Sequence, residues 1–215
     1  MMGSKLCASL VMEVKRKGIH ISGLSVPAAI ILLGKGPTIG LVAIALLAAL
    51  FLERRRLSGK IRLPSVRDHE ADRVAGYIYY ILGALLTVLL FPPTIAIAAI
   101  LMLSLGDAAS GIIGSIVRGS AVRTEIMEGR SWRPKPLPVV AGTFAVCLLV
   151  GYAAYLIEGR FFSGPELLSF PVFLVGAATA TFADAVPLSF RKRVIDDNFT
   201  IPVLSGLVMF FASLL

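Results

Sequence analysis

Charged residues are scarce in this chain. Asp, Glu, Lys and Arg make up 16% of its 215 residues, whereas soluble domains contain about 25%. Hydrophobic residues account for 57%, and the mean hydropathy is +0.86. No hydrophilic stretch is long enough to form a separate soluble core. We therefore expect a single transmembrane catalytic domain over residues 19–215, preceded by a basic, amphipathic segment over residues 1–18.

Several familiar signatures are also missing. The two cysteines, Cys7 and Cys147, are too few for a disulfide framework and lie outside any metal-binding spacing. The sequence has no GxxxxGK[ST] loop, no kinase-type glycine loop and no HExxH pair, which excludes the common soluble nucleotide-binding and zinc-peptidase motifs. The net charge of +8 fits loops biased to one membrane face better than it fits nucleic acid, so no nucleic-acid partner is expected.

The apolar residues fall into long runs separated by turns. A helix needs about 20 apolar residues to cross the hydrocarbon core of a bilayer. The sequence therefore predicts an all-α, multi-pass membrane protein with about seven transmembrane helices. The expected segments are residues 19–34, 37–52, 74–91, 94–117, 137–157, 168–187 and 200–215.

Positive charge supports this division. Seven crossings place residues 1–18, 53–73, 118–136 and 188–199 on one face, and that face receives 19 of the 21 Lys and Arg residues. Loops rich in Lys and Arg stay in the cytoplasm. We expect a cytoplasmic N-terminus, a prokaryotic cell-membrane location and an active site on the cytoplasmic face. The sequence leaves the oligomeric state open.

The first candidate site is the stretch KRKGIH, residues 15–20. At helical spacing Glu13, Arg16, Lys17 and His20 share one face at the start of the first crossing. An interfacial anchor on anionic lipid would explain the Lys and Arg residues equally well. It does not explain a histidine placed just inside the apolar segment.

The second candidate site, GDAASGIIG, begins at Gly106 and places Asp107 after an uninterrupted apolar run. An ionisable residue inside a membrane segment marks function by default. Gly106, Ser110 and Gly114 recur every four residues, which permits close packing of another helix. The structural alternative is a packing stripe whose aspartate pairs with a nearby arginine. A carboxylate among glycines also suits a divalent cation and a polyphosphate.

The third candidate site joins ATFADAVP, which contains Asp184, to DDNFTIP, which contains Asp197 and Asn198. The second stretch is expected to precede a helix that carries Pro202 in its first turn, so simple helix capping is an equal alternative there. All three candidate sites lie at the same ends of their helices. Carboxylates beside a basic rim are typical of Mg²⁺-dependent phosphoryl transfer. The rim would comprise Arg118, Arg123, Arg130, Arg133, Lys135, Arg191, Lys192 and Arg193.

These four motifs, in this order, resemble the CTP-dependent polyprenol kinase family, which includes dolichol kinase, phytol kinase and yeast-type diacylglycerol kinase. The family is distantly similar to phosphatidate cytidylyltransferase. The resemblance spans about residues 13 to 205. It implies transfer of the γ-phosphate of CTP, with Mg²⁺, to the hydroxyl of a membrane lipid alcohol.

The resemblance also implies roles for individual residues. Asp107, Asp184 and Asp197 would hold the metal, and Asp107, Asp184 and His20 would be catalytic. His20 would act either as the general base or as a hydrogen-bond donor to phosphate. The implied nucleotide-binding residues are Arg16, Lys17, Gly106, Gly111, Gly114, Lys135 and Asn198. The chain departs from the family where Ala141 stands in place of a glutamate, and Asp184 also replaces a glutamate.

Two other functions remain open at this stage. A cytidylyltransferase would use the same metal and basic rim to join CTP to a lipid phosphate, although the KD and HGG elements of that family are missing. A transporter or non-catalytic membrane protein could line an ion path with these aspartates, but transporters commonly show two matching halves, and we find no such repeat. For a kinase we expect an isoprenoid alcohol such as phytol, geranylgeraniol or dolichol. It would reach Asp107 through a membrane-facing groove lined by the small residues near Gly106 and Gly176.

The charge distribution yields a test of topology. Lys35 and Arg160 should face outward, whereas Arg55, Arg130 and Lys192 should face the cytoplasm. Single cysteines at these positions, in a background lacking Cys7 and Cys147, can be exposed to a membrane-impermeant thiol reagent in intact cells. Labelling at 35 and 160 alone is expected, and labelling at 55 or 130 from outside would contradict the arrangement.

Overall fold

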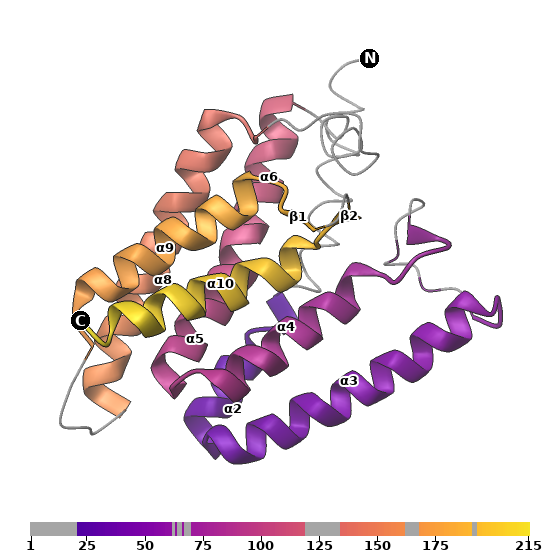
Figure 1. Ribbon diagram of the computed structural model, residues 1–215, viewed down its shortest axis with the longest axis horizontal. Coiled ribbons are helices and arrows are strands. Elements are labelled where there is room, and N and C mark those ends of the chain that lie inside the picture. The colour runs from indigo at the N-terminus through magenta and orange to yellow at the C-terminus, as the bar shows by residue number, and fades with distance from the viewer. Residues whose placement is uncertain are drawn as a thin grey trace.

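The computed structural model describes residues 21–61, 63, 66, 70–118, 134–161, 168–190 and 193–215. Within these ranges the chain is almost entirely helical (Figure 1). The helices are α2 (Ser25–Leu33), α3 (Lys35–Leu57), α4 (Gly76–Leu90), α5 (Pro93–Leu101), the π-helical turn η2 (Met102–Gly106), α6 (Asp107–Arg118), α8 (Leu137–Phe161), α9 (Phe170–Ala185) and α10 (Asp197–Ala212).

The expected segments coincide with these helices to within a few residues, with four differences. The helix described in the first segment, α2, has only nine residues, whereas a crossing needs about 20. The fourth segment is continuous but contains the π-helical turn η2. Helix α10 begins at Asp197 rather than at 200, so Pro202 lies inside it. A two-residue antiparallel hairpin, β1 (Ser189–Phe190) with β2 (Arg193–Val194), joins α9 to α10 and is the departure from an all-α chain.

Three described helices are long and apolar enough to cross a membrane: Lys35–Leu57, Pro93–Val117 and Leu137–Glu158. Helices α4, α9 and α10 are apolar but have only 15 or 16 residues. They lie alongside the longer ones in the bundle. The expected number of seven crossings and the orientation of the N-terminus stay predictions.

Helix α5 occupies the centre of the bundle. Every side chain from Ile95 to Ile100 is at most 1% exposed. Helices α2, α4, α8, α9 and α10 all pack against α5 or the π-helical turn that continues it. Because α5 is packed on all sides, it sets where the helix that continues it, and with it Asp107, lies relative to the surrounding helices.

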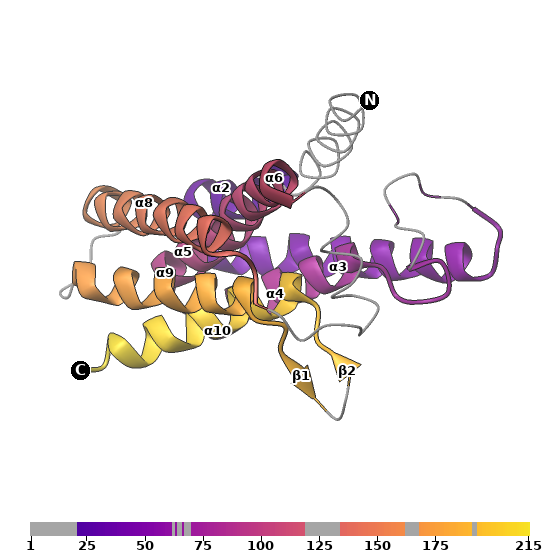
Figure 2. The same ribbon diagram turned by 90° about the horizontal axis from the view of Figure 1, so that it is seen from above.

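Helix α3 extends past the rest of the bundle at one end (Figure 2), and it continues to Leu57 where the sequence predicted a loop from residue 53. The extension is stabilised by Glu53 and Arg56, which are 3% and 9% exposed. Two nitrogens of the Arg56 guanidinium group, Nε and Nη2, donate to the Glu53 carboxylate at 2.7 and 2.8 Å. Pairing at positions i and i+3 neutralises the two charges, so the helix can carry them into a buried contact.

The glutamate and arginine also hold the segment that leads into α4. Glu53 accepts hydrogen bonds from the Ala75 amide at 2.8 Å and the Tyr77 hydroxyl at 2.7 Å. Arg56 donates to the carbonyl oxygens of Ala71 and Arg73. This buried pair therefore determines where the first turn of α4 begins.

Two turns that the sequence predicts on the same face of the membrane are in contact. The ammonium group of Lys35, the first residue of α3, donates at 2.9 Å to the carbonyl of Phe91, in the turn before α5. Asp107 lies where η2 meets α6, Asp184 in the last turn of α9 and Asp197 at the start of α10, all away from this contact. The alternation of the loops between two membrane faces stays a prediction.

The contact between α4 and α10 depends on Gly83. A Cβ atom at this position would lie 2.9 Å from the Asn198 carbonyl oxygen and 3.2 Å from the Phe199 Cα, both of which belong to the backbone. We expect Gly83→Ala to lower the free energy of unfolding by about 1–3 kcal/mol, because a crowded core must shift. Thermal unfolding in detergent measures the effect.

The matched control is Gly40→Ala, on α3, where a Cβ atom would meet nothing within 4 Å. Alanine favours a helix over glycine, so this variant should unfold at or above the wild-type temperature. Equal midpoints for the two variants would contradict the close contact at Gly83.

Candidate active site

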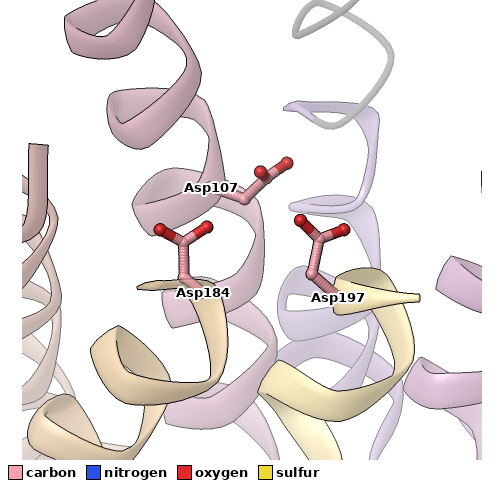
Figure 3. A group of neighbouring side chains, drawn as sticks. All are labelled: Asp107, Asp184 and Asp197. Atoms are coloured by element: carbon pink, nitrogen blue, oxygen red, sulfur yellow. The ribbon is translucent and has the colours of Figure 1, made fainter. Parts of the chain in front are cut away.

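Three carboxylates from distant parts of the sequence converge at one end of the bundle. Asp107 is the first residue of α6, Asp184 lies in the last turn of α9, and Asp197 is the first residue of α10. One oxygen from each lies within 4.8 Å of the others, and the side chains point toward a shared space (Figure 3). Asp107 is 1% exposed and Asp184 is 5% exposed.

Local structure directs each aspartate into this space. The π-helical turn η2 ends immediately before Asp107. Each residue advances a helix by about 100°, so the extra residue in a π-helical turn rotates everything that follows it. Asp196 caps α10 by accepting a hydrogen bond from the Asn198 amide at 3.0 Å. Asp197 then occupies the first turn, where the helix dipole favours a negative charge.

Lys135 joins the three aspartates from the other side. Its ammonium lies 2.6 Å from Asp184 Oδ1 and 2.8 Å from the Ser110 hydroxyl. Its backbone amide donates to the Ala185 carbonyl at 3.0 Å, which fixes the start of α8 beside the end of α9. The sequence singled out Lys135 from a family motif, and the structure places it in contact with the site.

The charges fit a divalent cation. Three carboxylates this close, two of them buried and Asp197 partly exposed, repel one another unless positive charge is added, and Lys135 supplies one positive charge. Carboxylate oxygens are the preferred ligands of Mg²⁺. Within the described part of the chain, Asp184 Oδ2 is buried and receives no hydrogen bond, so it is available as a ligand.

Asn198 lies beside the three aspartates on α10. Its side-chain amide donates to Asp196 Oδ1 at 2.7 Å, and the residue is 3% exposed. A Cβ atom at Gly76 would lie 3.1 Å from Asn198 Nδ2 and 3.4 Å from Glu70 Oε1. The first residue of α4 therefore lies in close contact with Asn198, next to the three aspartates.

The glycines behave differently from one another. A Cβ atom at Gly106 would lie 2.6 Å from Cys147 Sγ, and one at Gly176 would collide with Met209. Side chains therefore fill the space beside these two glycines, and the predicted lipid groove at Gly106 and Gly176 is wrong. Gly114 has open space around it, and Gly111 is partly exposed, so both can lie near a ligand at the end of α6.

The predicted basic-histidine motif, which contains Arg16, Lys17 and His20, lies outside the described residues. Gly23, a few residues later, is buried against the Tyr80 hydroxyl. Tyr80 shares a hydrogen bond of 2.6 Å with Ser104 in η2. The chain that follows the motif therefore runs beside the helix that presents Asp107. Most of the predicted basic rim also lies outside the described residues.

Sequence reasoning missed Glu53 and Arg56, which hold the segment before Gly76. A signal was present, because Glu53 ends an apolar run and has an arginine three residues later. The cluster of charged residues around Glu53 and Arg56 nevertheless favours a loop in the sequence prediction. Their buried pairing shows that this charge cluster is partly structural.

Comparison with known proteins gives one curated relative. The chain is 25% identical over 162 residues to CTP-dependent diacylglycerol kinase 1 of Schizosaccharomyces pombe, and the match covers 72% of this chain and 68% of that protein. No protein-family model matches the chain. No solved structure matches it either.

The ion pair between Lys135 and Asp184 gives a stability prediction. Lys135→Met leaves a buried carboxylate, 2% exposed, without its cation. Breaking such a pair should cost about 3 kcal/mol in metal-free buffer. Because the extra negative charge favours a divalent cation, 5 mM Mg²⁺ should recover most of the lost thermal stability.

Lys35→Met is the control, since Lys35 donates to a carbonyl oxygen at the opposite end of the bundle. It should lose about 1 kcal/mol, with no recovery by Mg²⁺. Thermal midpoints measured with and without Mg²⁺ provide the comparison. Equal recovery in both variants would show that Mg²⁺ does not act at the three aspartates.

Proposed function

We propose that this protein is a CTP-dependent lipid kinase that transfers the γ-phosphate of CTP to the hydroxyl of a membrane-embedded lipid alcohol. The observation that carries the proposal is the cluster of Asp107, Asp184 and Asp197 with Lys135, at the end of a bundle of apolar helices. The similarity to a CTP-dependent diacylglycerol kinase supports the choice of reaction.

The three aspartates would hold Mg²⁺, which when bound neutralises charge on the phosphates. The burial of Asp107 and Asp184 would keep bulk water away from the reacting groups, and this matters because water would compete with the lipid hydroxyl for the phosphoryl group. Lys135 holds Asp184 in place and supplies a positive charge beside it. Positioning and charge neutralisation are the main contributions that phosphoryl transfer needs from a protein.

The nucleotide would approach from the end that carries the basic segments. Gly111, Gly114, Lys135 and Asn198 lie at this end of the bundle. We assign Arg16 and Lys17 to the nucleotide phosphates. His20 would contact the reacting phosphate or the acceptor hydroxyl. These assignments rest on the motif resemblance, together with the path of Gly23 beside Tyr80. We place this end of the bundle in the cytoplasm because it receives most of the Lys and Arg residues.

For the acceptor we propose an isoprenoid alcohol. The loops offer no soluble domain to recognise a large headgroup, and an isoprenoid alcohol presents only a hydroxyl at the membrane surface. The relative's printed name specifies diacylglycerol, so that lipid is the direct competitor in any assay. The helices themselves do not discriminate between them, because lipid tails contact apolar surface of either kind.

The test is a two-substrate assay of the purified protein in mixed micelles. CTP, ATP, GTP and UTP are each supplied with phytol, geranylgeraniol, a dolichol or diacylglycerol, with Mg²⁺ present. We expect CDP and a phosphorylated isoprenoid. Release of pyrophosphate would instead indicate a cytidylyltransferase. A preference for diacylglycerol above about tenfold in kcat/KM, or about 1.4 kcal/mol, would overturn the acceptor and leave the kinase reaction intact.

Variants connect the activity to the three aspartates. Asp107→Asn removes a charged ligand with little change of shape, and it should lower kcat at least about 100-fold, the order seen for losing one positioned charge-stabilising group. Glu158→Gln is the control. This buried carboxylate, 6% exposed, accepts from the Leu168 amide at 3.0 Å at the opposite end of α8, and its variant should keep most of the activity. Near-normal turnover by Asp107→Asn would contradict the assignment.

A further inference from the structure

In the described part of the bundle, one buried threonine hydroxyl lacks a hydrogen-bond partner. Thr143, on α8, is 1% exposed, and within the described part of the chain its Oγ1 has no hydrogen-bond partner. A buried polar group without a partner costs about 1–3 kcal/mol. Most such groups in native proteins are satisfied, so an exception calls for an explanation.

Other helical hydroxyls in this protein show what Thr143 could have done. Thr38, Thr87 and Thr181 each donate to the carbonyl four residues earlier, at 2.7 or 2.8 Å. Ser205 does the same. This local bond is the ordinary way to satisfy a threonine or serine in an apolar helix. Thr143 sits in a regular helix and does not form it.

The position of Thr143 places it at the level of the three aspartates. Helices α6 and α8 run antiparallel, because Cys147 lies against Gly106 while Lys135, before the start of α8, reaches Ser110. Thr143 comes one turn before Cys147, on the side toward Lys135. It therefore lies between the level of Gly106 and that of Ser110, which brackets Asp107.

The orientation of the side chain is also informative. A Cβ atom at Gly106 would lie 3.9 Å from the Thr143 methyl group, Cγ2, and its hydroxyl is not among the atoms within 4 Å. The methyl group therefore makes the packing contact with the π-helical turn. The hydroxyl occupies the other branch of Cβ, turned away from that contact.

A second buried oxygen atom that receives no hydrogen bond within the described residues belongs to the neighbouring helix. Asp184 Oδ2, on α9, is buried and receives no hydrogen bond within the described residues, and α8 packs along α9. One oxygen of this carboxylate is held by Lys135 and the other is open. Two buried oxygens on adjacent helices, at the level of two further carboxylates, are oxygen donors of the kind that hard cations bind.

We propose that the Thr143 hydroxyl is a fourth oxygen in the coordination environment of the cation held by Asp107, Asp184 and Asp197, bound directly or through a coordinated water. This inference rests on the proposed metal site. The burial of Thr143 favours a small ion and its water over a triphosphate, which must approach from solution. Three carboxylates that each supply one oxygen leave three of the six Mg²⁺ positions for other oxygens.

The experiment measures Mn²⁺ binding, without nucleotide or lipid, by the electron paramagnetic resonance signal of free Mn²⁺ over detergent-solubilised protein. Thr143→Val removes the hydroxyl and keeps the shape, and it should weaken the Mn²⁺ Kd about 10-fold, in the range found for groups that support a metal ligand. Thr143→Ser keeps the hydroxyl and should remain within about threefold of wild type.

Thermal unfolding supplies a readout with opposite sign. In metal-free buffer Thr143→Val should unfold at or above the wild-type temperature, because an unsatisfied buried hydroxyl has been removed. Mn²⁺ should then raise its midpoint less than it raises that of wild type. Thr87→Val is the control, since Thr87 is 0% exposed and bonded to Gly83. It should lose stability without metal and bind Mn²⁺ normally.

The outcomes separate this inference from the metal site itself. If Asp107→Asn abolishes Mn²⁺ binding and Thr143→Val binds as wild type does, the role of Thr143 is wrong and the site stands. A metal-free loss of stability in Thr143→Val equal to that of Thr87→Val would identify a structural hydroxyl. Failure of the wild-type protein to bind Mn²⁺ would overturn the metal site and the role of Thr143 together.

Discussion

The three aspartates at one end of the bundle impose the strongest constraint on this structure. Carboxylates brought within 4.8 Å of one another, with Asp107 and Asp184 buried among apolar helices, would repel one another and lose much of their hydration, which is costly. The chain offsets part of this cost with Lys135 on Asp184 and with the dipole of α10 at Asp197. What remains is a negative pocket whose charge suits a divalent cation. Its position is set by the most buried helix in the described part of the chain, α5.

Close packing beside these aspartates holds α4 against α10. Gly76 and Gly83 allow the first half of α4 to lie against the backbone and side chain of Asn198. Glu53 and Arg56 fix the segment before Gly76 through a buried ion pair and four further hydrogen bonds. The contact of α3 with the segment before α4 thereby helps to position α4, and α4 packs against the helix that carries Asp197. Close helix packing thus serves the geometry of the site as well as stability.

The proposed lipid kinase reaction needs both a membrane location and a charged site. Apolar helices would allow a lipid to diffuse alongside the protein, while the three aspartates would receive the nucleotide. The glycines expected to line a lipid groove are instead filled by Cys147 and Met209. These two glycines therefore serve to bring helices together, and the proposed acceptor would reach Asp107 by another surface.

The sequence by itself determined the helices, their approximate ends, the sorting of charge, and the aspartates that belong to the site, since hydropathy and motif order are local properties. It singled out Asp107, Asp184, Asp197 and Lys135. Only the tertiary structure decided that Lys135 pairs with Asp184, that Glu53 and Arg56 are buried, and that Thr143 lacks a partner. These facts depend on which side chain fills which gap between helices distant in sequence. The π-helical turn before Asp107 adds a rotation that the regular periodicity of hydrophobic residues does not reveal.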